Sequence, residues 1–411
     1  MRSHHPTILH VNIRLGEGGA ASIARDLHAR LLSDGYVSRF AYGYGHRGKA
    51  DPMETEVPNC FRVGATVQAG LNMVISRTIG SGSEVFAAGS IAQYRQFIDE
   101  LVGADVVHLH CIHSYFTSPL WLLSVLADLG KPVVWTTHDH WLVTGRCALP
   151  GSCDGWRSGC GQCPTNKNYP PSLFDFSHQR FVSKRQALRR ISNLHIVAPA
   201  QHMACELQIA LPEARMSVIH NGLDRGFEKC LAEGLYDEPS ASDTGIPQVL
   251  VVAANLSDPQ KHDISLISEL SSGGSCTVHT VGARSPFSGR SCVNHGVTSS
   301  RSDLVRRYSK MDVLLFTSRV DMYPMVIVEA LSCGLPVVAS SSAAADEVLG
   351  MVGGSTLPSS HDIKNVISDR SWWNLYPQKS KEELQHDSLL AFSGQSMCQA
   401  YESVYAQMLH R

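Results

Sequence analysis

The chain has 411 residues, of which 43% are hydrophobic and 18% charged, so it can bury a large core, and its length suggests two globular domains. Its 35 basic and 37 acidic residues give a formal net charge of -2, which disfavours nucleic acid as a partner. The start lacks the apolar core and cleavage site of a signal peptide, and no run of about 18 apolar residues could cross a bilayer, so we expect a cytoplasmic protein whose 12 cysteines stay thiols or bind metal.

The first half of the chain alternates strands and helices. Apolar strands are predicted in "TILHVNI", "ADVVHLH", "KPVVWTTHDH" and "LHIVAPA", and a helix from about Ser22 to Ser33 follows the first of them. The second half repeats the pattern, with strands in "QVLVVAAN", "CTVHTVGA", "DVLLFTS" and "PVVAS". Short β-rich runs between helices indicate an α/β fold, in which helices cover both faces of a parallel sheet.

Two similar α/β domains follow from this repetition. The turn at Asn221-Gly222 in "SVIHNGLDRGF" marks the boundary, so we predict one domain over residues 1–220 and a second over 221–390. The last segment, from about Asp387 to Arg411, reads as a helix. Open parallel sheets bind ligands beyond the carboxyl ends of their strands, so two such domains facing each other are expected to form a cleft.

"GEGGAA" lies between the first strand and the first helix. Its glycines, Gly18 and Gly19 among them, allow a ligand to approach the helix N-terminus, or they allow tight packing alone. A dinucleotide fold would need a third glycine where this chain has Ala21, and an acid about 20 residues later, so NAD binding is rejected.

"TTHDHW" carries two histidines and an acid just past an apolar strand. A structural histidine and a metal site formed by His138, Asp139 and His140 are both conceivable. Because His138 is the first of these residues able to point from the sheet end into the cleft, we favour a hydrogen bond from His138 to a sugar hydroxyl or to a developing charge.

"CALPGSCDGWRSGCGQC" contains four cysteines, Cys147, Cys153, Cys160 and Cys163. The final C-x-x-C lets two thiolates reach one tetrahedral ion, and four sulfurs would complete a structural zinc site. The first spacing is five residues rather than two to four, so zinc and reduced thiols packing a glycine-rich loop both stay open.

"HQRFVSKRQALRRISNLH" reads as a helix with five basic residues. It could rest on an anionic membrane surface. Because its charges do not all lie opposite its apolar positions, a solvated helix is the preferred interpretation.

"DPQKHD" places Lys261 beyond the first strand of the second domain, as a surface charge or as a partner for a diphosphate. Further on, "VDMYPMVIVEALSCGLPVVAS" predicts a helix from Met325 to Ser332 that contains Glu329. Glu329 needs a polar partner because an unpaired buried charge is costly, and Asp321 precedes a helix N-terminus that favours anions. The structural alternative is that Asp321 caps this helix and Glu329 pairs with a buried Arg.

These motifs resemble the retaining, nucleotide-sugar-dependent glycosyltransferases of family 4 over essentially the full chain. An acid, seven residues, a Glu and then "ALSCGLPVVAS" is similar to the family signature, and "GGA", the "HD" at His138 and Asp139, "PAQHMACEL" and "VIHNGLD" support it. "VVHLHCIHSYF" with "HDHWLVTGRC" and "SGCGQCP" looks closer to the WcaC-like, colanic-acid-type branch.

The resemblance implies a GT-B fold: an acceptor-side Rossmann-like domain, a nucleotide-sugar-binding Rossmann-like domain, and a helix over 391–411 that crosses back to the first domain. It implies that Glu329 binds the ribose and Asp321 the donor sugar, and that the N–H groups of Met325 and Val326 meet the diphosphate. It further implies that Lys261 aids departure of the diphosphate and that His138 lines the reacting centre.

The sequence departs from the family pattern in two places. Asp321-Met322 stands where the family usually has Glu-Gly, and Asn255 stands where it usually offers an Arg. Neutralisation of the phosphates then rests on Lys261, with Arg319 as a candidate helper. These changes bear on donor binding rather than on the fold.

We therefore expect a retaining hexosyltransferase that needs no cofactor for catalysis, with a structural zinc left open. Its donor is a nucleotide sugar and its acceptor a lipid-linked or growing exopolysaccharide, with the protein cytoplasmic or peripheral at the inner face of the membrane. An epimerase, or a non-catalytic partner that binds sugar nucleotide, is the alternative.

Overall fold

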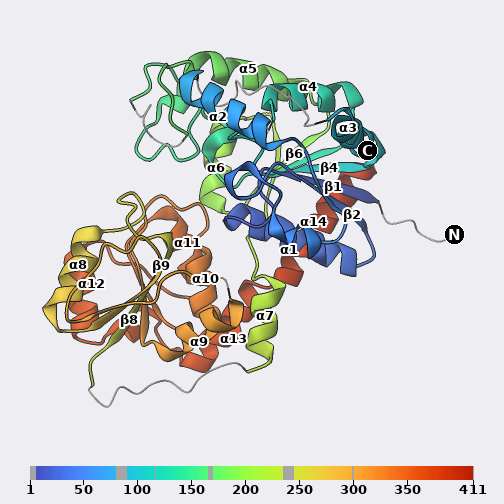
Figure 1. The fold of residues 1–411 in the computed structure, drawn as a ribbon. Coiled ribbons are helices and arrows are strands. Elements are labelled where there is room, and N and C mark those ends of the chain that lie inside the picture. The colour runs from blue at the N-terminus through green and yellow to red at the C-terminus, as the bar shows by residue number, and fades with distance from the viewer. Residues whose placement is uncertain are drawn as a thin grey trace. The chain divides into compact units, whose positions relative to one another are not determined.

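The structure, a computed structural model, describes residues 6–79, 90–115, 117–164, 170–234, 245–298 and 300–410. The chain divides into two compact units, one formed by Met1–Ile219 with Met397–Arg411 and the other by His220–Ser396 (Figure 1). Each unit has its own parallel sheet, so the predicted α/β architecture with two sheets is confirmed. None of the described helices is both long and apolar enough to cross a membrane.

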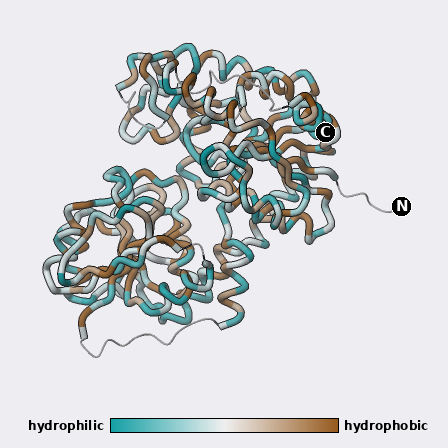
Figure 2. Tube along the Cα trace, viewed as in Figure 1, coloured by the Kyte–Doolittle hydropathy of each residue, from teal (hydrophilic) through white to brown (hydrophobic). Residues whose placement is uncertain are grey.

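The first unit contains a seven-stranded sheet whose paired strands are all parallel. Its strands are β1 (Thr7–Asn12), β2 (Val37–Tyr42), β3 (Cys60–Arg62), β4 (Val106–Leu109), β5 (Val133–Thr136), β6 (Leu194–Ala198) and β7 (Arg215–Val218). They lie in the order β3-β2-β1-β4-β5-β6-β7. Most residues of the central strands are apolar and buried, as expected for a sheet covered on both faces, but His10 on β1 and His108 on β4 are buried among them. Figure 2 maps the hydropathy of each residue onto the view of Figure 1, with hydrophobic segments in both units.

Helices cover both faces of this sheet. They are α1 (Gly19–Ser33), α2 (Thr66–Ile79), α3 (Ile91–Gly103), α4 (Pro119–Leu129), α5 (Ser177–Arg189), α6 (Gln201–Ala210) and α14 (Gly394–Leu409), with the short 3-10 helices η1 (His46–Gly48), η2 (Pro52–Thr55), η3 (His140–Leu142) and η4 (Gly155–Arg157). Helices α4 and α5 lie over one face, and α1 and α14 over the other (Figure 1).

The second unit contains a five-stranded parallel sheet in the order β10-β9-β8-β11-β12. Its strands are β8 (Gln248–Asn255), β9 (Thr277–Ala283), β10 (Cys292–Asn294), β11 (Val313–Phe316) and β12 (Val337–Ala339). Its helices are α7 (Arg225–Ala232), α8 (Ile264–Gly273), α9 (Arg301–Lys310), α10 (Met325–Ser332), α11 (Ala343–Gly350), α12 (Ser360–Ser368) and α13 (Lys381–Ala391), with the 3-10 helix η5 (Trp372–Leu375).

The C-terminal segment differs from the sequence prediction. The prediction of a single helix from Asp387 to Arg411 is wrong, because α13 ends at Ala391 and α14 begins at Gly394. Between them the Leu223 N–H donates to the Phe392 carbonyl over 2.9 Å. A side chain at Gly222 would meet the Gly394 Cα at 2.5 Å, so the backbone at Gly222 lies close to the backbone at the point where the two helices are separated.

Candidate active site

The start of α10 is an open helix N-terminus. Pro324 precedes the helix, and no side chain caps it. Among the described residues, the N–H groups of Met325 and Val326 have no hydrogen-bond partner, whereas the Ile327 N–H donates to the Pro324 carbonyl. Unpaired N–H groups together with the helix dipole favour a bound anion. This end of α10 can therefore accept a phosphate group.

Glu329 lies on α10 with only 12% of its side chain exposed. The Tyr308 hydroxyl on α9 donates to its carboxylate over 2.9 Å. Arg301, at the start of α9, lies 4.0 Å from the other carboxylate oxygen and forms a closer ion pair with Asp224, at 2.7 Å. Glu329 thus has the polar partner that its sequence position demanded, and this partner is a hydroxyl rather than a close cation.

Burial raises the pKa of Glu329 to about 7, although Arg301 and the Tyr308 hydrogen bond act in the opposite direction and Asp224 raises it further. A carboxyl with this pKa changes its charge near neutral pH. It can accept hydrogen bonds from hydroxyls of a polar ligand, which stabilise the ionised form.

Lys261 and Asp321 contact each other. The Lys261 ammonium donates to the Asp321 carboxylate over 2.7 Å, with 37% and 23% of the two side chains exposed. Asp321 therefore does not cap α10, contrary to the structural alternative. An accessible ammonium next to an accessible carboxylate offers one group for an anion and one for hydroxyls.

Arg319 and Asn255 do not join this pair. Arg319 is exposed. Burial opposes the lowering of the Asp263 pKa, which comes mainly from hydrogen bonds with Leu266 and Ser360, and the charge of Arg319 contributes less. Asn255, at the end of β8, accepts hydrogen bonds from the N–H and the hydroxyl of Ser257. The side-chain oxygen of Asn255 is thus engaged within its own loop.

In the first unit, Gly18 and Gly19 form the open start of α1. Gly18 has φ +96°, a left-handed conformation that favours glycine, and α1 has no side-chain cap. A Cβ added at either position would meet no atom within 4 Å. Space above this helix N-terminus is therefore open to a ligand.

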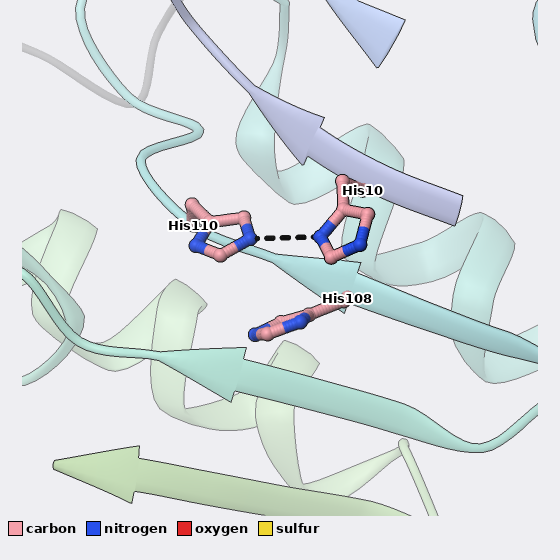
Figure 3. A group of neighbouring side chains, drawn as sticks. All are labelled: His10, His108 and His110. Carbon is pink, nitrogen blue, oxygen red and sulfur yellow. Dashed lines mark hydrogen bonds between the residues drawn. The ribbon is translucent and has the colours of Figure 1, made fainter. Parts of the chain in front are cut away.

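His138 follows β5 and is part of a row of imidazoles. Its Nε2 lies 3.0 Å from Nδ1 of His110. Nε2 of His110 in turn lies 3.2 Å from Nδ1 of His10 (Figure 3). Burial lowers the pKa of His138 to about 4, although Asp139 opposes this shift. At physiological pH His138 is therefore neutral, and it can offer a ligand hydrogen bonds rather than charge.

The metal alternative for His138, Asp139 and His140 finds no support in the geometry. Among the described residues these three do not form a group with converging ligand atoms. The Asp139 carboxylate lies 2.8 Å from the His113 ring and accepts the Trp141 N–H, while His140 bonds Glu206.

Comparison with known sequences identifies the family. The sequence model of Glycosyltransferase Family 4 matches residues 17–227, and that of Glycosyl transferases group 1 matches residues 263–368. The chain is 36% identical to an Escherichia coli (strain K12) protein named as a colanic acid biosynthesis glycosyl transferase, WcaC, over 98% of this chain and 100% of that protein. The chain belongs to glycosyltransferase family 4.

Solved glycosyltransferase structures share this fold. Anabaena Alr3699/HepE in complex with UDP matches 98% of this family 4 chain and 100% of its own, with a TM-score of 0.61 at 16% identity. Sucrose-phosphate synthase from Thermosynechococcus elongatus matches 99% and 100%, with a TM-score of 0.64 at 13% identity. The two Rossmann-like sheets are therefore those of a GT-B fold, as predicted.

Sequence reasoning missed several residues around the family 4 acids. Tyr308 and Arg301 lie beside Glu329 but come from a segment with no recognisable motif, and Asp224, which pairs with Arg301, ends the quoted motif "VIHNGLD". His110 belongs to the quoted motif "VVHLHCIHSYF", yet its contact with His138 depends on which face of the sheet each residue occupies. Only the sheet register could reveal it.

The four cysteines of the family 4 chain lie in one loop region. In the part of the chain that the structure describes, no three of their sulfurs lie within 4.8 Å of one another. Burial raises the pKa of Cys147 to about 11, and the Cys160 sulfur accepts the Gly145 N–H. A tetrahedral zinc site, with Zn–S bonds of about 2.3 Å, would need these sulfurs to move closer, so zinc stays a prediction.

The basic helix α5 packs against the first unit. Phe181, Lys184 and Leu188 are buried, and the Lys184 ammonium lies 3.5 Å from the centre of the Trp141 ring. The buried face of α5 thus contains a lysine as well as apolar residues, whereas Arg189 and Arg190 are exposed.

Proposed function

We propose that this glycosyltransferase moves a hexose from a nucleotide sugar, with retention, to a lipid-linked or growing exopolysaccharide of the colanic-acid type. The observation that carries the proposal is the arrangement at α10. Asp321, paired with the accessible Lys261, precedes the open N-terminus of this helix in the sequence, and the nearly buried Glu329 follows it. The open helix N-terminus and the ammonium suit a diphosphate, and the two carboxylates suit the hydroxyls of a sugar and a ribose.

In this proposal the nucleotide sugar binds the second unit. Glu329 accepts the ribose hydroxyls, and the N–H groups of Met325 and Val326 donate to the diphosphate. The donor exchanges the Lys261–Asp321 bond for its own contacts, so that Lys261 meets the diphosphate and Asp321 the sugar hydroxyls. The solved HepE complexes with UDP and with UDP-glucose support a nucleotide sugar as donor.

The remaining predicted residues have supporting roles in the proposal. Arg319 adds positive charge for the phosphates, Asn255 holds the loop after β8, and His138 contacts the transferred sugar. Gly18 and Gly19 leave room for a ligand at the start of α1.

The proposed chemistry needs neither a cofactor nor a protein nucleophile. The bond from the anomeric carbon to the diphosphate breaks, and the acceptor oxygen bonds to the same face of that carbon. The acceptor proton passes to the departing phosphate oxygen, and Lys261 neutralises the developing charge. His138, neutral at physiological pH, offers no charge to this step.

The assay follows nucleotide release with and without a polysaccharide acceptor. We expect release only with acceptor, and loss of transfer in both Glu329→Ala and Asp321→Ala while the proteins keep their circular dichroism spectra. Retained transfer in both variants would remove the proposed roles. Epimerised donor without release would support the epimerase, and donor binding without turnover on any acceptor would support a non-catalytic partner.

We also propose that the first unit contacts the inner face of the cytoplasmic membrane through α2 and the segment beside it. Helix α2 buries the polar residues Gln68, Asn72 and Ser76 and exposes apolar ones, with Val67 83% and Val74 59% exposed. An exposed apolar helix face is typical of a surface that meets lipid or another protein.

The apolar surface continues beyond α2. Leu173 and Phe174 are 76% and 58% exposed, and their N–H groups donate to carbonyls at the end of α2. Exposed Arg77 lies at the same helix end, and it supplies the positive charge that anionic lipid headgroups attract. We therefore propose that this surface binds an anionic lipid membrane.

Sedimentation with vesicles of phosphatidylcholine and phosphatidylglycerol tests this contact. We expect Val74→Asn with Leu173→Asn to weaken vesicle binding severalfold, since apolar burial drives interfacial binding. Leu390→Asn is the matched control, because Leu390 is 67% exposed on α13 of the other unit. Equal binding of all three proteins would contradict the proposed surface.

A further inference from the structure

Four histidines lie along one face of the first sheet. His10 on β1 and His108 on β4 are register partners, so their side chains share a face. His110 lies two residues after His108 on the same face, and Figure 3 shows its ring beside those of His10 and His108. His10, His108 and His110 are 0%, 0% and 2% exposed. Burial lowers the pKa of all three, so these imidazoles are neutral.

Three of the four form a hydrogen-bonded chain that leads from His10 through His110 to His138. A neutral imidazole carries one N–H, so His110 can donate from only one of its two nitrogens. Both bonds must therefore run in the same direction. Either His10 donates to His110 and His110 to His138, or His138 donates to His110 and His110 to His10.

The buried end of the chain decides between the two directions. Nε2 of His10 is buried, and none of the residues that the structure describes forms a hydrogen bond with it. If the chain ran toward His10, that nitrogen would carry an unpaired buried N–H, which native proteins rarely tolerate. If the chain runs toward His138, Nδ1 of His10 is protonated and Nε2 holds only a lone pair. The second arrangement leaves no buried donor unpaired.

His108 packs against this chain of hydrogen bonds but is not part of it. Its two nitrogens bond the Tyr405 hydroxyl on α14 and the Thr136 hydroxyl on β5 over 2.7 and 2.8 Å. Its ring lies against His110, with ring centres 4.2 Å apart. The orientation of the His110 ring is therefore held by packing as well as by its own hydrogen bonds.

We propose that His10 and His110 are positioning residues that hold His138 in its Nδ1–H tautomer, so that this N–H is the group His138 offers to an oxygen of the donor sugar or its phosphate. The inference rests on the proposed function for the identity of that oxygen. Nδ1 of His138 has no hydrogen-bond partner among the described residues and is not among the buried unpaired atoms. A donor in this position cannot act as a base, so the acceptor proton must go elsewhere.

Nitrogen NMR of the ligand-free, 15N-histidine-labelled protein tests the tautomer directly, with His138→Gln identifying the signals of His138. We expect Nδ1 of His138 to be protonated in the wild type. His110→Asn keeps an amide donor where Nδ1 stood and should preserve that tautomer, whereas His110→Leu should release it to a mixture. A protonated Nε2 in the wild type, or an unchanged signal in His110→Leu, would overturn the inference.

Activity and metal analysis complete the test. We expect His110→Leu to lower kcat about tenfold, the effect of losing one ordinary hydrogen bond, and His110→Asn to restore most of it at an unchanged KM. The nitrogens of His10, His108 and His110 also lie within 4.8 Å of one another. Stoichiometric zinc in the purified wild type that is lost in His110→Leu would therefore contradict the proposed chain of hydrogen bonds between the histidines. If no acceptor supports transfer, the proposed function fails while the tautomer result stands.

Discussion

At the scale of single residues, burial of Glu329 links the stability of the protein to pH. Its pKa rises from 4.5 to about 7 in the folded state, so between these values the folded chain holds a proton that the unfolded chain has lost. The free energy of unfolding therefore falls as pH rises through this window, by roughly 3 kcal/mol in total from this group.

The comparison of wild type with Glu329→Gln isolates this effect from the other titrating groups. We expect the variant to gain stability relative to the wild type as pH rises from 5 to 8, measured by urea unfolding at each pH. Unfolding curves whose separation does not change with pH would show that Glu329 titrates normally.

The sequence predicted that Glu329 needs a polar partner, but it could not name one. Tyr308 and Arg301 come from another helix, and nothing in their local pattern marks them as neighbours of α10. The pairing of Lys261 with Asp321 was likewise invisible, because 60 positions of sequence separate them. Sequence patterns identify residues that need partners, whereas the partners themselves follow from tertiary packing.

At the scale of elements, the sequence predicted both ends of α10 correctly, because the signals that begin and end this helix are local. Pro324 precedes the helix, and Gly334 follows it with φ +69°. The Leu335 N–H donates back to the Ala330 carbonyl over 3.0 Å and closes the helix.

Gly334→Ala tests this closure. A Cβ would meet the Lys381 carbonyl oxygen at 3.0 Å in a left-handed conformation, so we expect a loss of about 1–2 kcal/mol in unfolding free energy. Gly350→Ala, where an added Cβ meets no atom within 4 Å, is the control. Equal urea midpoints for the two variants would contradict this account of the helix end.

Helix α2 shows where local pattern is insufficient. Its sequence has no feature that says which face is buried, and the structure buries the polar face. The interruption between α13 and α14 was also missed, because the close approach of Gly222 to Gly394 joins segments far apart in sequence.

At the scale of the whole molecule, the sequence predicted both parallel sheets because the central strands are short apolar runs that alternate with helices, whereas short strands such as β3 and β10 carry no such pattern. The family signature around Glu329 then indicated a glycosyltransferase before any geometry was known. The donor nucleotide and sugar depend on loop contacts, which neither the apolar pattern nor the signature encodes.

The central claim is that a nucleotide sugar binds the second unit through Glu329. Thermal unfolding of the wild type and of Glu329→Ala against a panel of nucleotide sugars tests it most directly. A ligand at 100 times its Kd stabilises the native state by about 2.7 kcal/mol. We predict that at least one nucleotide sugar raises the Tm of the wild type and leaves that of Glu329→Ala unchanged, whereas no shift in the wild type, or the same shift in both proteins, would contradict the account.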